Sequence, residues 1–280
     1  MTRSIADKRA TFRSLHAQGC FVIPNPWDVG SARMLQHLGF AALASTSAGY
    51  AWSTGRADNA VTRDDVLAHL EALVAAVDVP VNADFESGFA REPEALAESV
   101  RRVVATGVAG FSIEDRELGA AGASGVLFDD ALAVERIRAA RAALAAEGAD
   151  VVLVARTERL LQDPTEVRWS IDRLVAFADA GADCLFAPGI RAPEDIAALV
   201  RAVAPRPVNV VMARPGPDVA ALAALGVRRI SVGGALARVA WSAMIHAAQQ
   251  IREGRFDGLA AGGPGAPGTV DLNGIFAGFV

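Results

Sequence analysis

Two carboxylates stand two residues apart where an apolar segment ends. The segment Val79–Phe85 reads as a buried strand, and Asp84 and Glu86 lie at its end, followed by Gly88. Side chains at positions i and i+2 of a strand point to the same side, so both carboxylates are aimed at one place. A shared divalent cation with oxygen ligands would account for this arrangement. A solvated turn after the strand is the alternative.

Other carboxylates extend this pattern. Glu114 ends another apolar segment, and Asp58 lies in a loop after a third. Two unit charges about 4 Å apart repel each other by roughly 4 kcal/mol at an effective dielectric constant near 20. Mg²⁺ relieves such repulsion by binding one or two carboxylates directly and others through water. The sequence therefore predicts a Mg²⁺ site at Asp84, Glu86, Asp58 and Glu114, with Mn²⁺ as an alternative.

Arg156 ends the apolar run Val151–Arg156. An arginine in this position commonly binds a carboxylate or phosphate through two N–H groups. The alternative is an ion pair with Glu158 or Glu114. We predict that Arg156 binds the substrate.

The segment Ser45–Tyr50, STSAGY, offers backbone N–H groups among small residues, which suits an anion; close packing on the barrel is the alternative. Tyr50, the only tyrosine, could donate a proton or cover the site. Asn209 lies within the later apolar segment Pro207–Met212. We predict that Thr46, Ser47, Ala48 and Asn209 bind substrate and that Tyr50 joins Arg156 and Glu114 in catalysis.

Several other chemistries are excluded by position. Lys8, the only lysine, precedes the first strand and cannot be a Schiff-base lysine inside a barrel. The histidines all fall in helical stretches, so a zinc site of histidine ligands is not expected. The two cysteines lie far apart at strand beginnings and make no disulfide framework. The histidines are His16, His37, His69 and His246, and the cysteines are Cys20 and Cys184.

The composition is that of a globular protein. The chain has 280 residues, of which 52% are hydrophobic and 21% charged, with a net charge of −5 and a pI of about 5.4. No segment is strongly basic, so we expect no nucleic-acid partner. The first ten residues are polar and no apolar run is long enough to span a bilayer, so we expect no signal peptide, no membrane partner and a cytoplasmic, reduced location.

Short apolar strands alternate with Ala/Leu-rich helical segments. Near-continuous apolar strands are typical of parallel strands buried on both faces, and eight such units predict an α/β fold of the (β/α)₈ TIM-barrel type. A doubly wound sheet is the rival, but no G-x-G-x-x-G follows the first strand. We expect one barrel domain over 1–280 with an extension from about 255 to 280. The predicted strands are Phe21–Asn25, Ala41–Thr46, Val79–Phe85, Gly110–Glu114, Val151–Thr157, Cys184–Pro188, Pro207–Met212 and Arg229–Gly233.

Taken together, these motifs resemble the isocitrate lyase/phosphoenolpyruvate mutase superfamily from about Gly19 to Gly234. NADFESGFA resembles its metal motif D-x-D-x-G-[YF]-G, with Glu86 in place of the second Asp. GFSIEDR and VLVARTE resemble two further strands of the family. The resemblance implies that Asp84 binds Mg²⁺ most directly, that Asp58 and Glu114 do so through water, and that Arg156 and the amides of Thr46, Ser47 and Ala48 hold the substrate carboxylate. It also implies a homodimer or homotetramer in which the C-terminal helix is swapped between subunits.

The family breaks or makes a bond next to a carbonyl through an enolate. The loop Arg116–Asp130 lacks the Cys, His and Lys of the K-K-C-G-H lyase loop and the K-x-N-S-like mutase loop, and Ala187 stands where mutases carry a His. We therefore expect a Mg-dependent lyase that cleaves a C–C bond in a small oxo- or hydroxy-carboxylate, by oxaloacetate-type decarboxylation or retro-aldol cleavage. The alternatives are a P–C bond enzyme (phosphoenolpyruvate phosphonomutase or phosphonopyruvate hydrolase-like) and a non-catalytic oxyacid-binding member. The Gly/Ala-rich loop suits a mobile lid; a surface loop is the alternative.

Overall fold

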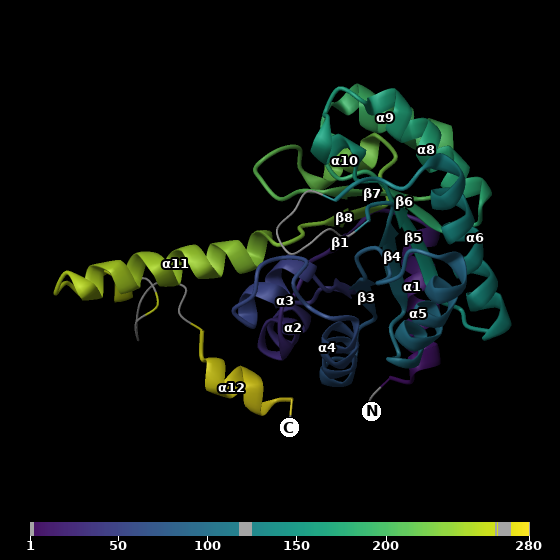
Figure 1. The fold of residues 1–280 in the computed structure, drawn as a ribbon. Coiled ribbons are helices and arrows are strands. Elements are labelled where there is room, and N and C mark those ends of the chain that lie inside the picture. The colour runs from purple at the N-terminus through teal and green to yellow at the C-terminus, as the bar shows by residue number, and fades with distance from the viewer. Residues whose placement is uncertain (1–2, 118–124, 261, 263–269, 280) are drawn as a thin grey trace.

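Eight parallel strands form the centre of the fold and helices surround them (Figure 1). The computed structural model describes residues 3–117, 125–260, 262 and 270–279. The strands are β1 (Phe21–Ile23), β2 (Leu43–Ala44), β3 (Val81–Asp84), β4 (Gly110–Glu114), β5 (Val152–Arg156), β6 (Cys184–Phe186), β7 (Val208–Val211) and β8 (Arg229–Ser231).

Helices follow the strands along the chain. They are α1 (Ile5–Ala17), α2 (Val29–His37), α3 (Ser47–Ser53), α4 (Arg63–Ala76), α5 (Pro93–Ala105), α6 (Asp130–Ala146), α7 (Arg159–Gln162), α8 (Val167–Asp179), α9 (Pro193–Val203), α10 (Val219–Ala224), α11 (Ala235–Arg252), the 3₁₀ turn η1 (Asp257–Leu259) and α12 (Leu272–Ala277).

The strands pair in the order β1-β8-β7-β6-β5-β4-β3-β2, always in parallel. Between β1 and β2 two hydrogen bonds close the ring in place of a ladder. The Ala44 amide donates to the Pro24 carbonyl at 3.0 Å, and Asn25 Nδ2 donates to the Ser45 carbonyl at 2.8 Å. The predicted (β/α)₈ barrel is therefore confirmed.

All eight predicted strands exist, but several are shorter than predicted. The clearest case is the segment predicted as Ala41–Thr46, which is a strand only over Leu43–Ala44. Thr46 instead caps α3, because its hydroxyl accepts a hydrogen bond from the Gly49 amide. The short strand and the early helix bring the α3 N-terminus to the barrel mouth.

Two apolar clusters hold the barrel together. Inside the ring, Ile23, Ala44, Val154 and Phe186 pack in a cluster that Phe12 of α1 joins from below the first strand. Outside the ring, a larger cluster fills the layer between strands and helices, with Leu70 and Leu96 among its fully buried members. Burial on both faces explains why the strands read as almost continuous apolar runs.

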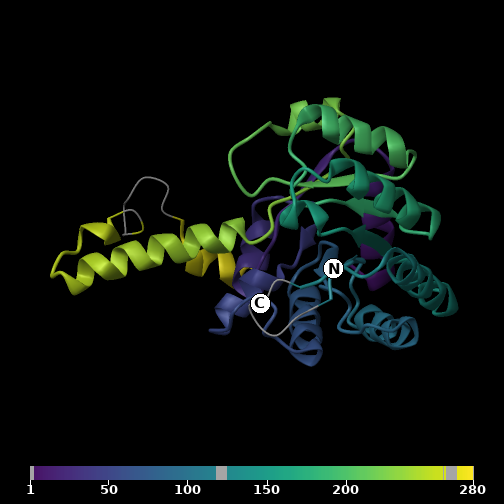
Figure 2. The same ribbon diagram turned by 45° about the horizontal axis from the view of Figure 1, so that its top comes forward.

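The C-terminal segments lie apart from this core. Helix α11 extends away from the barrel, and Figure 2 shows the same separation from a second direction. Its apolar side chains Val239, Met244 and Ile245 are 67%, 48% and 48% exposed. No helix within the described parts of the chain has both the length and the apolar character needed to cross a bilayer.

The predicted lid is described only at its ends. Residues 118–124 lie outside the described residues, as do 261, 263–269 and 280 of the predicted C-terminal extension. At the base of the loop, Arg116 and Leu127 form an antiparallel bridge, and the Glu117 amide donates to the Val126 carbonyl at 2.8 Å.

The burial of His16 makes the stability of the protein depend on pH. Burial is the main reason that the pKa of His16 falls from 6.5 to about 3, and its ring packs edge-on against Phe12 and Phe21. Below pH 6.5 the unfolded chain takes up a proton that the folded protein does not, so stability is lost as the pH falls. At pH 5 this contribution is about 2 kcal/mol.

We therefore expect His16→Gln to reduce the fall in urea-unfolding free energy between pH 7 and pH 5 by about 2 kcal/mol relative to wild type. His37, on the exposed end of α2, provides the matched control His37→Gln, which should keep the wild-type difference. An identical pH dependence in wild type and His16→Gln would disprove the assignment.

Candidate active site

The carboxyl ends of three neighbouring strands bring the predicted site residues together. Asp84 ends β3, Glu114 ends β4 and Arg156 ends β5. In the β4–β5 ladder Glu114 lies directly opposite Arg156. The barrel therefore places residues that are far apart in sequence at one mouth, as expected for the catalytic face of this architecture.

Arg156 lies at the centre of this cluster. Its Nε donates to Glu158 Oε1 at 2.5 Å, whereas Nη1 is 3.4 Å from Asp84 Oδ1 and Nη2 is 3.5 Å from Glu114 Oε2. The ion-pair alternative considered for Arg156 is thus present. The two Nη atoms have the longer contacts, so they are the ones that a ligand carboxylate could engage most readily.

Asp84 is held by the segment predicted to bind anions. The Ser47 amide donates to Asp84 Oδ2 at 3.0 Å, and the Asp84 amide donates to Ser45 Oγ at 2.9 Å. Among the described residues, the Ala48 amide has no hydrogen-bond acceptor. One of the amides predicted to bind substrate is therefore occupied by Asp84, and the next one along α3 remains open.

Asp58 reaches the same cluster from the loop after α3. Its side chain accepts hydrogen bonds from the Asn59 amide and from Ser47. Burial and the nearby Asp84 carboxylate raise the pKa of Asp58. Burial is the larger cause of this shift, and the charge of Asp84 adds to it.

Glu86 is subject to the same two effects. Both of its carboxylate oxygens are buried without a hydrogen-bond partner, and its backbone has a φ of +49°, unusual for a residue with a side chain. Burial, followed by the charges of Asp84, Glu114 and Asp58, raises the pKa of Glu86 to about 8. Burial and Glu158 likewise raise the pKa of Glu114.

A polar cavity of about 170 Å³ opens among these side chains. Its walls include Asp58, Asp84, Arg156 and the segment Ser45–Ala48. Glu86 and Glu114 are 2% and 3% exposed and stand behind this wall. The cavity therefore presents Arg156 and the open Ala48 N–H to a ligand, with the buried carboxyl groups of Glu86 and Glu114 behind them.

Two predicted site residues are placed elsewhere. The Tyr50 hydroxyl donates to the Asp65 carbonyl at 3.1 Å, and its ring stacks on His69, so it does not line the polar cavity. The catalytic role of Tyr50 stays a prediction, with its side chain outside the polar cavity. Asn209 is fully buried within the barrel, where its Nδ2 donates to Ser231 Oγ at 3.1 Å, and it does not line the cavity either.

Three further residues belong to the site, and two of them, Arg116 and Arg229, were not predicted from the sequence. Arg116 contacts Glu114 at 3.0 Å and supplies a second positive charge. Arg229, 3% exposed, lines the cavity floor and donates to Asn82 Oδ1 at 3.2 Å. Asn25 accepts from the Val232 and Gly233 amides. In the sequence, only the place of Arg229 in an apolar strand indicates that it belongs to the site. A charged residue there must point either into the barrel or into the layer between helices and sheet.

The residues fit a hard divalent cation bound largely through water. Within the described residues, no group of three or more His, Cys, Asp or Glu side chains converges closely enough to hold a metal directly. The unpartnered oxygens of Glu86 and the raised pKa values of Glu86 and Asp58 nevertheless leave a place for positive charge. Mg²⁺ accepts this kind of site, because it keeps several of its waters.

Known proteins resemble this chain in sequence and in fold. Residues 12–252 match the family of phosphoenolpyruvate phosphomutase. An uncharacterized protein of Mycobacterium tuberculosis (strain CDC 1551 / Oshkosh) is 35% identical over 247 residues, which cover 87% of this chain and 90% of that protein. The chain is thus similar to proteins of this family over almost its whole length.

Solved structures extend the similarity to the fold. A protein of Burkholderia cenocepacia J2315, provisionally assigned as a lyase/mutase, superposes with a TM-score of 0.90 at 47% identity, over 98% of this chain and 97% of that one. A 2,3-dimethylmalate lyase, a member of the PEP mutase/isocitrate lyase superfamily, superposes with a TM-score of 0.82 at 30% identity, over 99% and 94%.

The raised pKa of Glu86 predicts how the stability of the protein changes when this carboxyl group is replaced. Because its pKa is raised, the folded protein holds a proton that the unfolded chain releases, so Glu86 destabilises the fold increasingly from pH 4.5 toward pH 8. We expect Glu86→Gln to raise the free energy of unfolding in EDTA at pH 7 by about 1–3 kcal/mol and to weaken the stabilisation that Mg²⁺ or Mn²⁺ gives wild type.

Denaturant unfolding with EDTA or with added cation measures both effects. The exposed Glu71 on α4 provides the control Glu71→Gln, which should behave as wild type in both conditions. A Glu86→Gln protein that is no more stable in EDTA, or that gains as much from cation as wild type, would contradict this account of the cluster.

Proposed function

The chain belongs to the phosphoenolpyruvate phosphomutase family of the isocitrate lyase/phosphoenolpyruvate mutase superfamily, and from this we propose that it is a carbon–carbon lyase. Its substrate would be a small oxo- or hydroxy-carboxylate, cleaved next to a carbonyl through an enolate. The observation that carries the proposal is the polar cavity, in which Arg156 and the α3 N-terminus face a space of about 170 Å³.

The cavity is equipped for electrostatic rather than nucleophilic catalysis. Its walls contain no Cys, His or Lys among the described residues, and the loop Arg116–Asp130 has none in its sequence. What it offers is the partly buried guanidinium of Arg156 and the open backbone N–H of Ala48. Groups of this kind lower a barrier when they are aimed at charge that develops in the transition state.

Each residue would then have a definite task. The Ala48 amide and the Nη atoms of Arg156 would bind the substrate carboxylate and orient the bond to be broken. As that bond breaks, its electron pair moves toward the carbonyl oxygen, and the positive charge of Arg156 stabilises the enolate. The other fragment leaves as CO₂ from an oxo-acid, or as a carbonyl compound from a hydroxy-acid whose hydroxyl proton passes to water. Glu158 keeps Arg156 in place through Nε. A closed cavity would exclude water from the enolate.

A divalent cation fits this scheme. Mg²⁺ or Mn²⁺ would be held through Asp84 and, by way of water, through Asp58, Glu86 and Glu114, and when bound it would supply Lewis-acid polarisation of the substrate carbonyl. The unpartnered oxygens of Glu86 support this assignment.

Similarity to 2,3-dimethylmalate lyase favours C–C cleavage. We expect purified protein with Mg²⁺ to convert at least one carbon acid in a panel of oxaloacetate, substituted malates, methylisocitrate, phosphoenolpyruvate and phosphonopyruvate, followed by ¹H and ³¹P NMR. EDTA should stop the reaction. Arg156→Lys should lower kcat/KM about 10²-fold, because Lys cannot make the two-pronged contact. Arg201→Lys, at an exposed position of α9, should leave it unchanged.

Other outcomes would redirect the assignment. Product from phosphonopyruvate alone would identify a P–C bond enzyme. Metal-dependent ligand binding without product from any compound would indicate a non-catalytic oxyacid-binding protein.

We also propose that the protein is a homodimer or homotetramer joined through α11. The helix extends from the barrel with Val239, Met244 and Ile245 exposed, and near its base Trp52, Arg238 and Trp241 line an open cavity. Apolar side chains in this number on an extended helix are typical of an interface. A second copy of the chain could bury them, as in the predicted helix exchange.

Replacement of Val239 by Asp should therefore shift the molar mass in light scattering toward the monomer, because a charge would be buried in the interface. Val219→Asp, at a 43% exposed site on α10, should leave the mass unchanged. A monomeric wild-type protein, or an unchanged mass for Val239→Asp, would contradict the proposed assembly.

A further inference from the structure

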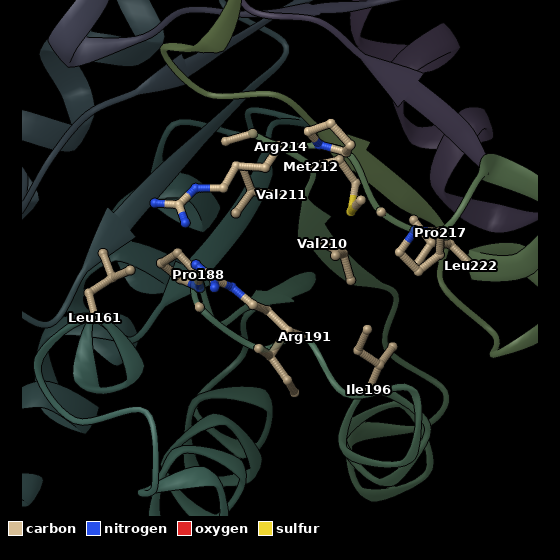
Figure 3. A pocket seen from close by; sticks show the side chains of 15 residues that line it. Leu161, Pro188, Arg191, Ile196, Val210, Val211, Met212, Arg214, Pro217 and Leu222 are labelled. Carbon is tan, nitrogen blue, oxygen red and sulfur yellow. The ribbon is translucent and has the colours of Figure 1, made fainter.

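A second, larger cavity adjoins the polar one. It has a volume of about 370 Å³ and lies at the carboxyl ends of β6 and β7, where α9 and α10 close its far side (Figure 3). Much of its wall is apolar, and Ile196, Val210, Met212 and Leu222 contribute to it. It could hold a group larger than the polar cavity accepts.

The two cavities share part of their walls. Pro188, just beyond β6, and Val211, the last residue of β7, line both of them. A molecule whose carboxylate is bound at Arg156 could therefore extend past these two residues into the larger cavity. Neither residue offers a side-chain hydrogen bond, so a ligand segment that passes beside them would have to be apolar.

Two arginines give the larger cavity its charge. Arg191 and Arg214 both line it, and in Figure 3 their side chains extend toward the side on which Leu161 is drawn. Neither makes an ion pair or side-chain hydrogen bond with a described residue, unlike Arg156 and Arg116 at the polar cavity. Two unpaired guanidinium groups beside an apolar wall suit an anionic group at the end of an apolar chain.

We propose that this cavity binds the non-reacting part of the substrate, an apolar substituent that ends in a carboxylate, with Arg191 and Arg214 as specificity-determining residues. The inference rests on the proposed function, because the reacting oxyacid end occupies the polar cavity. It narrows the substrate class to oxyacids larger than oxaloacetate that carry a distal carboxylate. The exposed Leu161, at 56%, would be covered by the chain of such a ligand.

Binding measurements test this without requiring turnover. Isothermal titration calorimetry with Mg²⁺ would compare three ligands: malate, malate with a 3-butyl substituent, and malate with a 3-(4-carboxybutyl) substituent. Wild type should bind the carboxylate-ended ligand roughly five- to tenfold more tightly than the butyl ligand. The double variant Arg191→Gln/Arg214→Gln should lose that preference.

Arg201→Gln is the matched control. Arg201 is likewise an exposed arginine, in α9, but it does not line the cavity. It should keep the wild-type preference. Leu161→Asn should weaken both substituted ligands while both arginines remain. These variants change exposed side chains, so the fold should persist, and thermal unfolding would verify it.

The outcomes separate the two levels of the proposal. Equal affinities for the two substituted ligands in wild type, or a preference that survives in the double variant, would overturn the assignment of the larger cavity and leave the proposed lyase site standing. Failure of malate and both derivatives to bind would overturn the oxyacid site itself, and the assignment of the second cavity with it.

Discussion

The Arg156 guanidinium joins carboxylates from three segments of the chain. It contacts Asp84 at the end of β3 and Glu114 at the end of β4, and it holds Glu158 beyond its own strand. Without its positive charge these carboxylates would face one another in a partly dry space, and removing one partner of a buried ion pair typically costs 3–5 kcal/mol. The residue best placed to bind a substrate carboxylate is therefore also required to keep the mouth of the barrel assembled.

A second constraint operates where the β ladder is incomplete. Between β1 and β2 the side chain of Asn25 replaces ladder hydrogen bonds: it donates to the Ser45 carbonyl and accepts from the Val232 and Gly233 amides. Ser45 in turn accepts from the Asp84 amide. The closure of the barrel and the position of the acidic cluster are therefore linked by hydrogen bonds. A displacement between β1 and β2 would thus also displace Asp84.

The sequence predicted the architecture and the main cluster because both depend on regular features. Apolar runs of strand length repeat eight times, and a parallel barrel collects their carboxyl ends at one mouth, which brought Asp84, Glu114 and Arg156 together as expected. The position of Tyr50 could not be inferred in this way. Its direction depends on a helix that begins at Ser47 and on a hydrogen bond to Asp65, neither of which follows from strand periodicity.

Asn209 shows a related limit. Alternation along a strand predicts that a side chain points inward, but it does not predict the depth at which the side chain lies. Asn209 points into the barrel below the cavity, whereas Val211, two residues later, reaches the cavity wall. Arg191 and Arg214 of the second cavity could not be predicted for another reason. They lie in loops after strands, where charged residues are usually solvated. Only the fold shows that they line one cavity.

An acidic protein that binds an acidic substrate must offset its own field. The chain carries a net charge of −5, and Asp58 and Asp84 line the polar cavity beside Arg156 and Arg229, so the lining offers an oxyacid no net positive charge. Arg156 is already shared among three carboxylates, so its positive charge is only partly available to a ligand. A bound cation would supply the missing charge at the reacting end, while Arg191 and Arg214, unpaired at the neighbouring cavity, would attract the other end. The distribution of positive charge thus favours a ligand with two separated anionic groups over one with a single carboxylate.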